Sequence, residues 1–397
     1  MIRINKLISL FLYLLFPMIG FLLSLISIRR TNNFIYLNCF YISIFIFIIF
    51  IYIPPLGDLY RHYQLFEYID LNNSKFYKLD FLFYLNLIIF KKLCIPFFIL
   101  PALYTSISVY LYLKSFEILY NKYSQNYVKI TTLIAYVLII LLNISFFTTA
   151  SGLRFGLSTA LVIFSYSLII SKNKKSIPLI ILLFASFIHF SSYLFIIIYF
   201  LSKIKLNKFT FIILSIIAII TSQIIVFLFE YLTQMLNYGH SYVLGKWADS
   251  SGKNLAGQIK IILNQTPFFL FLFLLIINRC TFKNINIIYW SVIIALLTKF
   301  SFTLFLRFSV VPTFIMLYIL LIAYKDKLII YIILLFSIVY FLSDSIYGYR
   351  RQILLGNMWE ALYKPPILKM INIDKDYNFM LNQINKDGLW IKNPVES

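Results

Sequence analysis

Charged residues are scarce in this chain. Asp, Glu, Lys and Arg make up only 12% of its 397 residues, whereas soluble globular domains carry about 25%. Acidic residues are the scarcest, with 14 against 35 Lys and Arg, and 61% of the chain is hydrophobic. Together with a mean hydropathy of +0.89, this excludes an ordinary soluble protein and predicts an all-α protein that crosses a membrane several times.

Motifs for metals and nucleotides are also scarce. Three cysteines, Cys39, Cys94 and Cys280, lie in or beside apolar runs without metal-ligand spacing, so we expect inert core residues. No glycine-rich phosphate loop occurs, which argues against nucleotide-driven chemistry. The acidic residues are spread along the chain, and we expect no cluster that would hold Mg²⁺. The sequence thus predicts an activity that uses neither a metal nor a cofactor.

Long apolar runs are abundant, at lengths near the roughly 20 residues that a bilayer-spanning helix needs. They do not alternate in the way that the strands of a β-barrel do. We find no internal repeat and no soluble domain, and we expect the first run to be a membrane helix rather than a cleaved signal. About ten helices are expected, over approximately 7–27, 34–53, 95–117, 129–147, 154–171, 208–229, 260–278, 285–305, 308–324 and 328–343.

Two further apolar segments differ from simple spans. Residues 81–93 are too short to cross a bilayer comfortably and end in Lys91-Lys92, so we expect a re-entrant or interfacial helix. The run 177–201 has lysines near both ends, which suggests that both ends lie on one side. We favour two half-helices that dip into the membrane with His189 at the bend; a single long helix is the alternative.

The basic residues lie singly or in short clusters between the apolar runs. This is the positive-inside pattern of membrane proteins, and we expect no nucleic-acid partner. If the clustered lysines and arginines are cytoplasmic, all acidic residues except Glu117 and Asp326 fall on the outer side. Only Arg3 and Lys6 oppose this orientation weakly, because they would lie on an external N-terminus.

This orientation defines the expected domain organisation. Residues 1–343 form a single helical transmembrane domain. Large polar loops at 54–94 and 230–260 lie on the outer face, followed by a polar tail at 344–397 on the same face. The orientation therefore brings several candidate functional residues to one side of the membrane.

Two arginines stand near the expected outer ends of apolar helices. Arg154 follows the small residues at 150–152, and Arg307 lies in the run TLFLRFSVVP. Ionisable groups inside a bilayer are costly, so they are functional hypotheses by default. Their side chains either reach lipid headgroup phosphates or bind a phosphate or pyrophosphate of a substrate. The second interpretation fits arginine because its planar guanidinium binds phosphate oxygens in pairs and stays charged.

Candidate acid–base groups are His189 and Asp58. His189 lies in an apolar run, and it is either a buried, hydrogen-bonded histidine or a base or phosphate ligand. Asp58 follows a Pro-Pro-Leu-Gly turn, and it either caps the next segment or deprotonates or binds a sugar hydroxyl. Arg61 and Tyr63 lie in the same loop and are candidate substrate-binding residues, Tyr63 as part of an aromatic path for a glycan.

The order of these elements resembles the EpsG family of bacterial membrane proteins, which groups with the Wzy-type O-antigen and exopolysaccharide polymerases. The resemblance covers most of the chain and is most specific between Arg154 and His189. Family members often carry an arginine before the Gly-Asp pair, where this chain has Ile-Pro-Pro-Leu. The matching elements are the pattern GD-x4-Y (Gly57, Asp58, Tyr63), the loop SGLR ending in Arg154, the run FIHFSS around His189, and the late Arg307.

The resemblance implies a GT-C-like architecture in the bacterial inner membrane. It implies a polymerase of O-antigen, capsule or exopolysaccharide that joins undecaprenyl-pyrophosphate-linked oligosaccharides on the periplasmic face and releases undecaprenyl pyrophosphate. Arg154 and Arg307 would stabilise the departing pyrophosphate, and Asp58 or His189 would activate the acceptor hydroxyl. The lipid bilayer and a chain-length regulator protein are the further expected partners.

Two other functions remain open. A glycosyltransferase that adds a single sugar from a polyprenyl-phosphate carrier would need the same arginines, and the length of its product separates it from a polymerase. A flippase or transporter of lipid-linked glycans is compatible with a broken helix at His189. Against it, we find no internal repeat, and the polar residues gather on one face.

Overall fold

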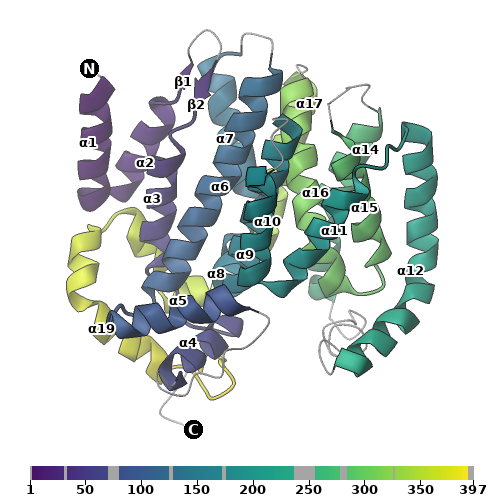
Figure 1. The fold of residues 1–397 in the computed structure, drawn as a ribbon. Helices are drawn as coiled ribbons and strands as arrows, with labels where there is room; N and C mark the ends of the chain where they lie inside the picture. Colours follow the sequence, from purple (N-terminus) through teal and green to yellow (C-terminus); the bar gives the residue numbers. More distant parts are fainter. Residues whose placement is uncertain are drawn as a thin grey trace.

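Figure 1 shows the computed structural model, which describes residues 2–30, 34–69, 80–124, 128–171, 176–236, 255–277, 284–324 and 327–391. Helices make up nearly all of its regular structure, so the all-α prediction is confirmed. Two short strands, β1 (Arg29–Arg30) and β2 (Ile35–Tyr36), pair antiparallel. The basic turn at 172–175, Cys280 and most of the expected loop 230–260 fall outside the described residues.

Five helical stretches in the described part of the chain are long and apolar enough to cross a membrane. The chain is therefore a multi-pass membrane protein, while the exact number of crossings stays a prediction. The stretches lie in α9 (Leu153–Ser171), α12 (Lys208–Leu236), α14 (Leu255–Ile277), α16 (Phe302–Ala323), and α17 (Lys327–Phe341) with the π-helical turn η2 (Leu342–Tyr347) that continues it.

The bundle has two different ends. Uppermost in Figure 1 lie the N-terminus and the two strands, and we call this the basic end because Arg29 and Arg30 form β1 there and Lys122 lies in the last turn of the neighbouring helix. We call the opposite end the site end. Short helices cover it: α4 (Asp58–Tyr68), α5 (Phe81–Lys92), α8 (Phe146–Ser151), α18 (Arg350–Leu355), η3 (Met358–Leu362) and α19 (Pro366–Asn382).

The expected single helix at 7–27 is wrong, because the chain forms α1 (Ile2–Leu15) and α2 (Pro17–Ile26), which fold back on each other. The break falls at Pro17, whose ring removes a backbone N–H and excludes the preceding turn. Close packing holds the pair together: a Cβ on Gly20 would stand 2.8 Å from the Tyr13 ring. The N-terminus consequently lies at the basic end, with the other basic segments (Figure 1).

The centre of the bundle is α6 (Ile99–Tyr123), which packs between α3 (Cys39–Phe50) and α9. Its Glu117, one of the two acidic residues expected on the basic side, is buried in the described structure. The Glu117 carboxylate accepts a hydrogen bond from the Leu37 N–H at 3.0 Å and pairs with Lys114. This carboxylate therefore has a structural reason to lie at the basic end.

The run 177–201 is broken at His189 into α10 (Ser176–Ile188), the 3₁₀ turn η1 (Phe190–Ser192) and α11 (Tyr193–Leu201). Near the basic end, the Ser165 hydroxyl of α9 donates to the Pro178 carbonyl at 2.7 Å. At the other end of α9, the rings of Phe155 and His189 stand 6.0 Å apart. α10 therefore runs antiparallel to α9 along most of its length.

The chain then returns to the basic end through α11. The Leu206 N–H donates to the side chain of Asn286 at 2.9 Å, and Asn286 begins α15 (Asn286–Leu297). Close by, Asn284 donates to the Ile169 carbonyl near the end of α9. Residues 176–206 thus form a hairpin with both ends at the basic end, as the flanking lysines predict, and its tip carries His189 to the site end.

Arg307 lies deeper in its helix than the sequence suggests. The expected boundary between helices at 305–308 is shifted, because α15 ends at Leu297 and α16 begins at Phe302. Ser301 caps α16, and its hydroxyl accepts a hydrogen bond from the Leu304 N–H at 3.4 Å. Arg307 consequently projects from the second turn of α16.

Candidate active site

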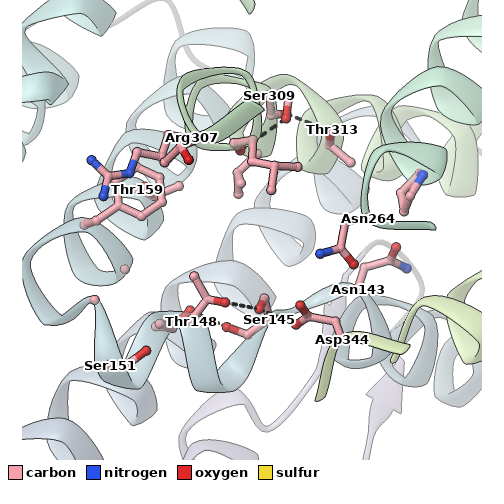
Figure 2. Close-up of a pocket in the computed structure, with 18 of the residues that line it drawn as sticks. Asn143, Ser145, Thr148, Ser151, Thr159, Asn264, Arg307, Ser309, Thr313 and Asp344 are labelled. Carbon is pink, nitrogen blue, oxygen red and sulfur yellow. Dashed lines mark hydrogen bonds between the residues drawn. The ribbon is translucent and has the colours of Figure 1, made fainter. Parts of the chain in front are cut away.

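A cavity of about 350 Å³ opens at the site end. Side chains from α4, α8, α9, α14, α16 and η2 line it, and Figure 2 shows the open space between them. Its charged lining residues are Asp58, Arg61, Arg307 and Asp344. The cavity therefore combines three of the residues that the sequence singled out with one that it did not.

The arginines occupy one part of the lining. The Arg307 guanidinium stands 5.5 Å from the centre of the Phe155 ring of α9, and Figure 2 shows Arg307 beside Thr159 of the same helix. Arg61 lies on α4 with 70% of its side chain exposed, 3.2 Å from the Asp58 carboxylate. Arg61 and Asp58 thus form a solvated pair beside the more deeply placed Arg307.

Hydrogen-bond acceptors occupy another part of the lining. Asp344 projects from η2, is buried, and accepts a hydrogen bond from the Ser145 hydroxyl. The Oδ1 atoms of Asn143 and Asn264 are buried and have no hydrogen-bond partner among the described residues. In Figure 2 these side chains lie across the open space from Arg307.

Arg154 and His189 lie outside this lining, in a buried cluster around Asp80. The Arg154 guanidinium donates to Asp80 Oδ2 at 2.6 Å, and His189 Nδ1 stands 3.5 Å from Oδ1. The backbone N–H of Phe190 also donates to Oδ1, at 2.8 Å. Asp80 therefore ties together the start of α5, the first turn of α9 and the tip of the hairpin.

The electrostatics of this cluster follow from its burial. Burial by itself would raise the pKa of Asp80. The contact with His189, the charge of Arg154 and the Phe190 N–H together outweigh burial, so the pKa lies below its ordinary value. His62 of α4 packs edge-on against Phe83, and burial, with the charge of Arg154 next, lowers the pKa of His62 to about 3. Near neutral pH the carboxylate is ionised and the His62 imidazole is neutral.

Tyr63 lies apart from both groups. Its ring packs edge-on against Phe97 and Tyr377, with ring centres 5.6 and 5.8 Å apart. The pair joins α4 to α19, so Tyr63 attaches the tail to the site end. Phe155 is the link between the other two groups, because its ring contacts both His189 and Arg307.

Two acidic residues of these groups are not among the candidates that the sequence alone suggests. Asp80 directly precedes a short apolar helix, and Asp344 directly follows a long apolar run. An acid at the end of an apolar run is the same signal that singled out Arg154, applied to the opposite charge. Asp344 was counted instead as the first residue of the tail.

One acidic pair lies close together in the sequence. Asp374 and Asp376 in α19 have the Asp-x-Asp spacing that binds metals in other proteins. No described side chain of α19 lines the cavity. Among the described residues, no group of three His, Cys, Asp or Glu is placed to hold a metal ion.

A second hollow, of about 310 Å³, adjoins the mouth of the cavity. The two share neighbouring residues of the chain, since Gly57 lines the hollow and Asp58 lines the cavity. Arg350, Arg351 and Trp390 contribute to the hollow. It offers cationic and aromatic side chains next to the entrance.

Comparison with known proteins identifies the family to which the chain belongs. The EpsG family model matches residues 34–354, a range that holds every charged residue of the cavity and of the Asp80 cluster. No curated protein and no solved structure matches the chain. Because the match extends over well more than half of its length, the chain belongs to the EpsG family, a family of membrane proteins with a polymerase-like role in polysaccharide biosynthesis.

Proposed function

We propose that the protein joins undecaprenyl-pyrophosphate-linked oligosaccharide units into a polysaccharide on the periplasmic face of the bacterial inner membrane. The observation that carries this proposal is Arg307, a guanidinium held in a cavity within the family-matched range. Undecaprenyl pyrophosphate is the leaving group. The proposed partners are the lipid-linked units, the bilayer and a chain-length regulator.

The orientation rests on the distribution of charge. Arg29, Arg30 and Lys122 lie at the basic end of the bundle, and short basic loops remain in the cytoplasm. The residues that line the cavity belong to the opposite end, which this orientation makes periplasmic. A donor that reaches this face is lipid-linked, because cytosolic nucleotide sugars do not.

The chemistry rests on charge that develops during the reaction. Glycosyl transfer passes through an oxocarbenium-like state while negative charge grows on the departing pyrophosphate. Arg307, with Arg61 at the mouth, is placed to stabilise that charge without a metal ion. Arg154 and His189 are already engaged with Asp80, and we assign them to positioning Phe155 and the hairpin tip.

The test is the surface polysaccharide of a strain that lacks the gene. We expect single repeat units in the deletion strain, a ladder of repeats after complementation with wild type, and no ladder with Arg307→Ala at equal protein level. A product with one added sugar would identify a single-sugar glycosyltransferase. Loss of even single units from the outer face would place the activity in flipping or earlier, and would overturn the proposal.

A further inference from the structure

We propose that Asp344 is the base that takes the proton from the acceptor hydroxyl, and that the wall it shares with Asn143 and Asn264 binds the acceptor sugar. This inference rests on the proposed function. It divides the cavity into an arginine side for the pyrophosphate of one lipid-linked chain and an acceptor side for the terminal sugar of another.

The first support is the placement of Asp344. Only 4% of the residue is exposed, yet it lines the cavity. It projects from η2, a π-helical turn at the end of an apolar helix, and π-helical turns occur frequently at functional sites. A buried carboxylate is costly in an apolar helix unless it has a partner or a function.

The second support is the row of hydroxyls behind the carboxylate. The Ser145 hydroxyl donates to Asp344 and stands 2.6 Å from the Thr148 hydroxyl, which stands 2.8 Å from that of Tyr349. The Ser145 hydroxyl is the donor in both of its contacts, to Asp344 Oδ2 and to the Thr148 hydroxyl, so its one proton is shared between them. The Ser145 hydroxyl thus fixes one carboxylate oxygen, Oδ2, whereas Oδ1 has no hydrogen-bond partner among the described residues and is left for a ligand.

The third support is the unmet hydrogen-bonding capacity beside it. The Oδ1 atoms of Asn143 and Asn264 are buried without a partner among the described residues. The Asn143 amide is fixed from its other side, because its Nδ2 donates to the Ser337 hydroxyl at 2.7 Å. Buried acceptors without donors are costly, and a sugar supplies several hydroxyl donors at once.

Positive charge near Asp344 comes from α14. Gly348 follows Asp344 by one turn, and a Cβ at Gly348 would stand 2.3 Å from the Lys260 ammonium. The same ammonium lies 5.4 Å from the centre of the Tyr349 ring. The absence of a side chain at Gly348 thus makes room for a counter-charge beside the carboxylate.

The transfer step balances as follows. The acceptor hydroxyl oxygen forms a bond to the anomeric carbon of the donor sugar, and its proton passes to Asp344 Oδ1. The bond between that carbon and the pyrophosphate oxygen breaks, and its electron pair leaves with undecaprenyl pyrophosphate. Asp344 later gives the proton to water that enters through the mouth.

The other candidate bases are placed less well. Asp58 has 47% of its side chain exposed and is paired with Arg61. The His189 ring is buried against Asp80 and does not line the cavity. Asp344 is the acid that combines burial, a fixed geometry and access to the cavity.

The experiment uses purified full-length protein and lipid-linked single units extracted from the deletion strain. Asp344→Asn should lower kcat by about 10²–10⁴-fold and change KM less than twofold, while Asp344→Glu recovers part of the rate. Asn264→Ala should raise KM several-fold with kcat near wild type. Asp387→Asn, the same substitution at an exposed position of the tail, is the matched control and should behave as wild type.

The outcomes separate two failures. If wild type makes no ladder from these units, the proposed function is wrong. If wild type makes a ladder and folded Asp344→Asn polymerises within threefold of its rate, the assignment of Asp344 is overturned. If Asp344→Asn does not fold, a kcat of Asp344→Glu equal to wild type with an unchanged KM of Asn264→Ala overturns it as well.

Discussion

The site end contains two polar groups built from the same kinds of residue. In the Asp80 cluster, the carboxylate accepts hydrogen bonds from the Arg154 guanidinium and the Phe190 N–H, and it also contacts His189. Both of its oxygens therefore have partners. In the cavity, Arg307 faces open space, and two amide oxygens have no partner in the described structure. The ring of Phe155 contacts both groups, His189 on one side and Arg307 on the other.

The difference teaches how to read ionisable residues in an apolar chain. A carboxylate whose hydrogen bonds are made fixes segments that are far apart in the sequence, whereas buried amide oxygens without a partner in the described structure are available to a ligand. Sequence alone assigns Arg154 and Arg307 to one role, because both stand near helix ends on one face. Their surroundings differ, because Arg154 is paired with Asp80 whereas Arg307 lines the cavity. Substitutions that separate stability from activity test whether their roles differ as well.

The largest expected effect is on stability, at Arg154. Arg154→Ala leaves the Asp80 carboxylate buried without its main partner, which costs about 3–5 kcal/mol, so little folded protein should be recovered. The double variant Asp80→Asn with Arg154→Gln removes both charges and should restore much of the thermal stability in detergent. A single variant that folds as well as wild type and loses only activity would place Arg154 in the substrate site.

The next effect is on activity, at Arg307. Arg307→Ala should lower kcat by about 10²–10³-fold with a melting temperature close to wild type. Arg307→Lys keeps the charge but loses the paired geometry, so we expect only partial recovery. The comparison fails if Arg307→Ala unfolds the protein as Arg154→Ala does.

A smaller effect concerns how stability depends on pH, through the buried imidazole of His62. The pKa of His62 falls to about 3 on folding. At a pH below the ordinary histidine pKa of about 6.5, His62 is therefore protonated in the unfolded chain but stays neutral in the folded protein. Stability should therefore fall as the pH drops from 7 towards 4, with a contribution from His62 of roughly 2 kcal/mol at pH 5. His62→Phe should flatten the melting temperature against pH; an unchanged slope would contradict the burial of His62.

The smallest effect is at the mouth. Asp58 and Arg61 are exposed, and such pairs contribute no more than about 1 kcal/mol. Arg61→Ala should leave the melting temperature unchanged and raise KM several-fold, more strongly at low salt than at high salt. Lys386→Ala, an exposed cation of the tail, serves as the control; equal effects of both variants would remove Arg61 from the site.

Most of the helices could be predicted from the apolar runs, but not where those runs break. Pro17 interrupts one run and separates α1 from α2, whereas Pro267 and Pro312 lie inside continuous helices. The outcome depends on whether a neighbouring helix satisfies the freed backbone groups, and sequence does not show the neighbour. The lysines flanking 177–201 did predict the hairpin, because charge at both ends is a local signal.

The candidate site was predictable only in part. Arg154, His189 and Arg307 stand out because apolar runs rarely contain such residues. Their partners do not, since Asp80 lies 74 residues from Arg154 and 110 from Phe190. Asp344 likewise lies 199 residues from Ser145, the hydroxyl that identifies it as buried and fixed.

The hairpin made by α10 and α11 has a consequence for biogenesis. Its two ends lie at the basic end, and its tip must bring His189 to the site end before it meets the Asp80 carboxylate. Until then the tip has no partner for its polar groups in lipid, so the hairpin is unstable as an isolated unit. Asp80 and Arg154 are synthesised earlier, and their pair forms the docking point that retains the hairpin once it arrives. The docking point for the hairpin is thus synthesised before the hairpin itself.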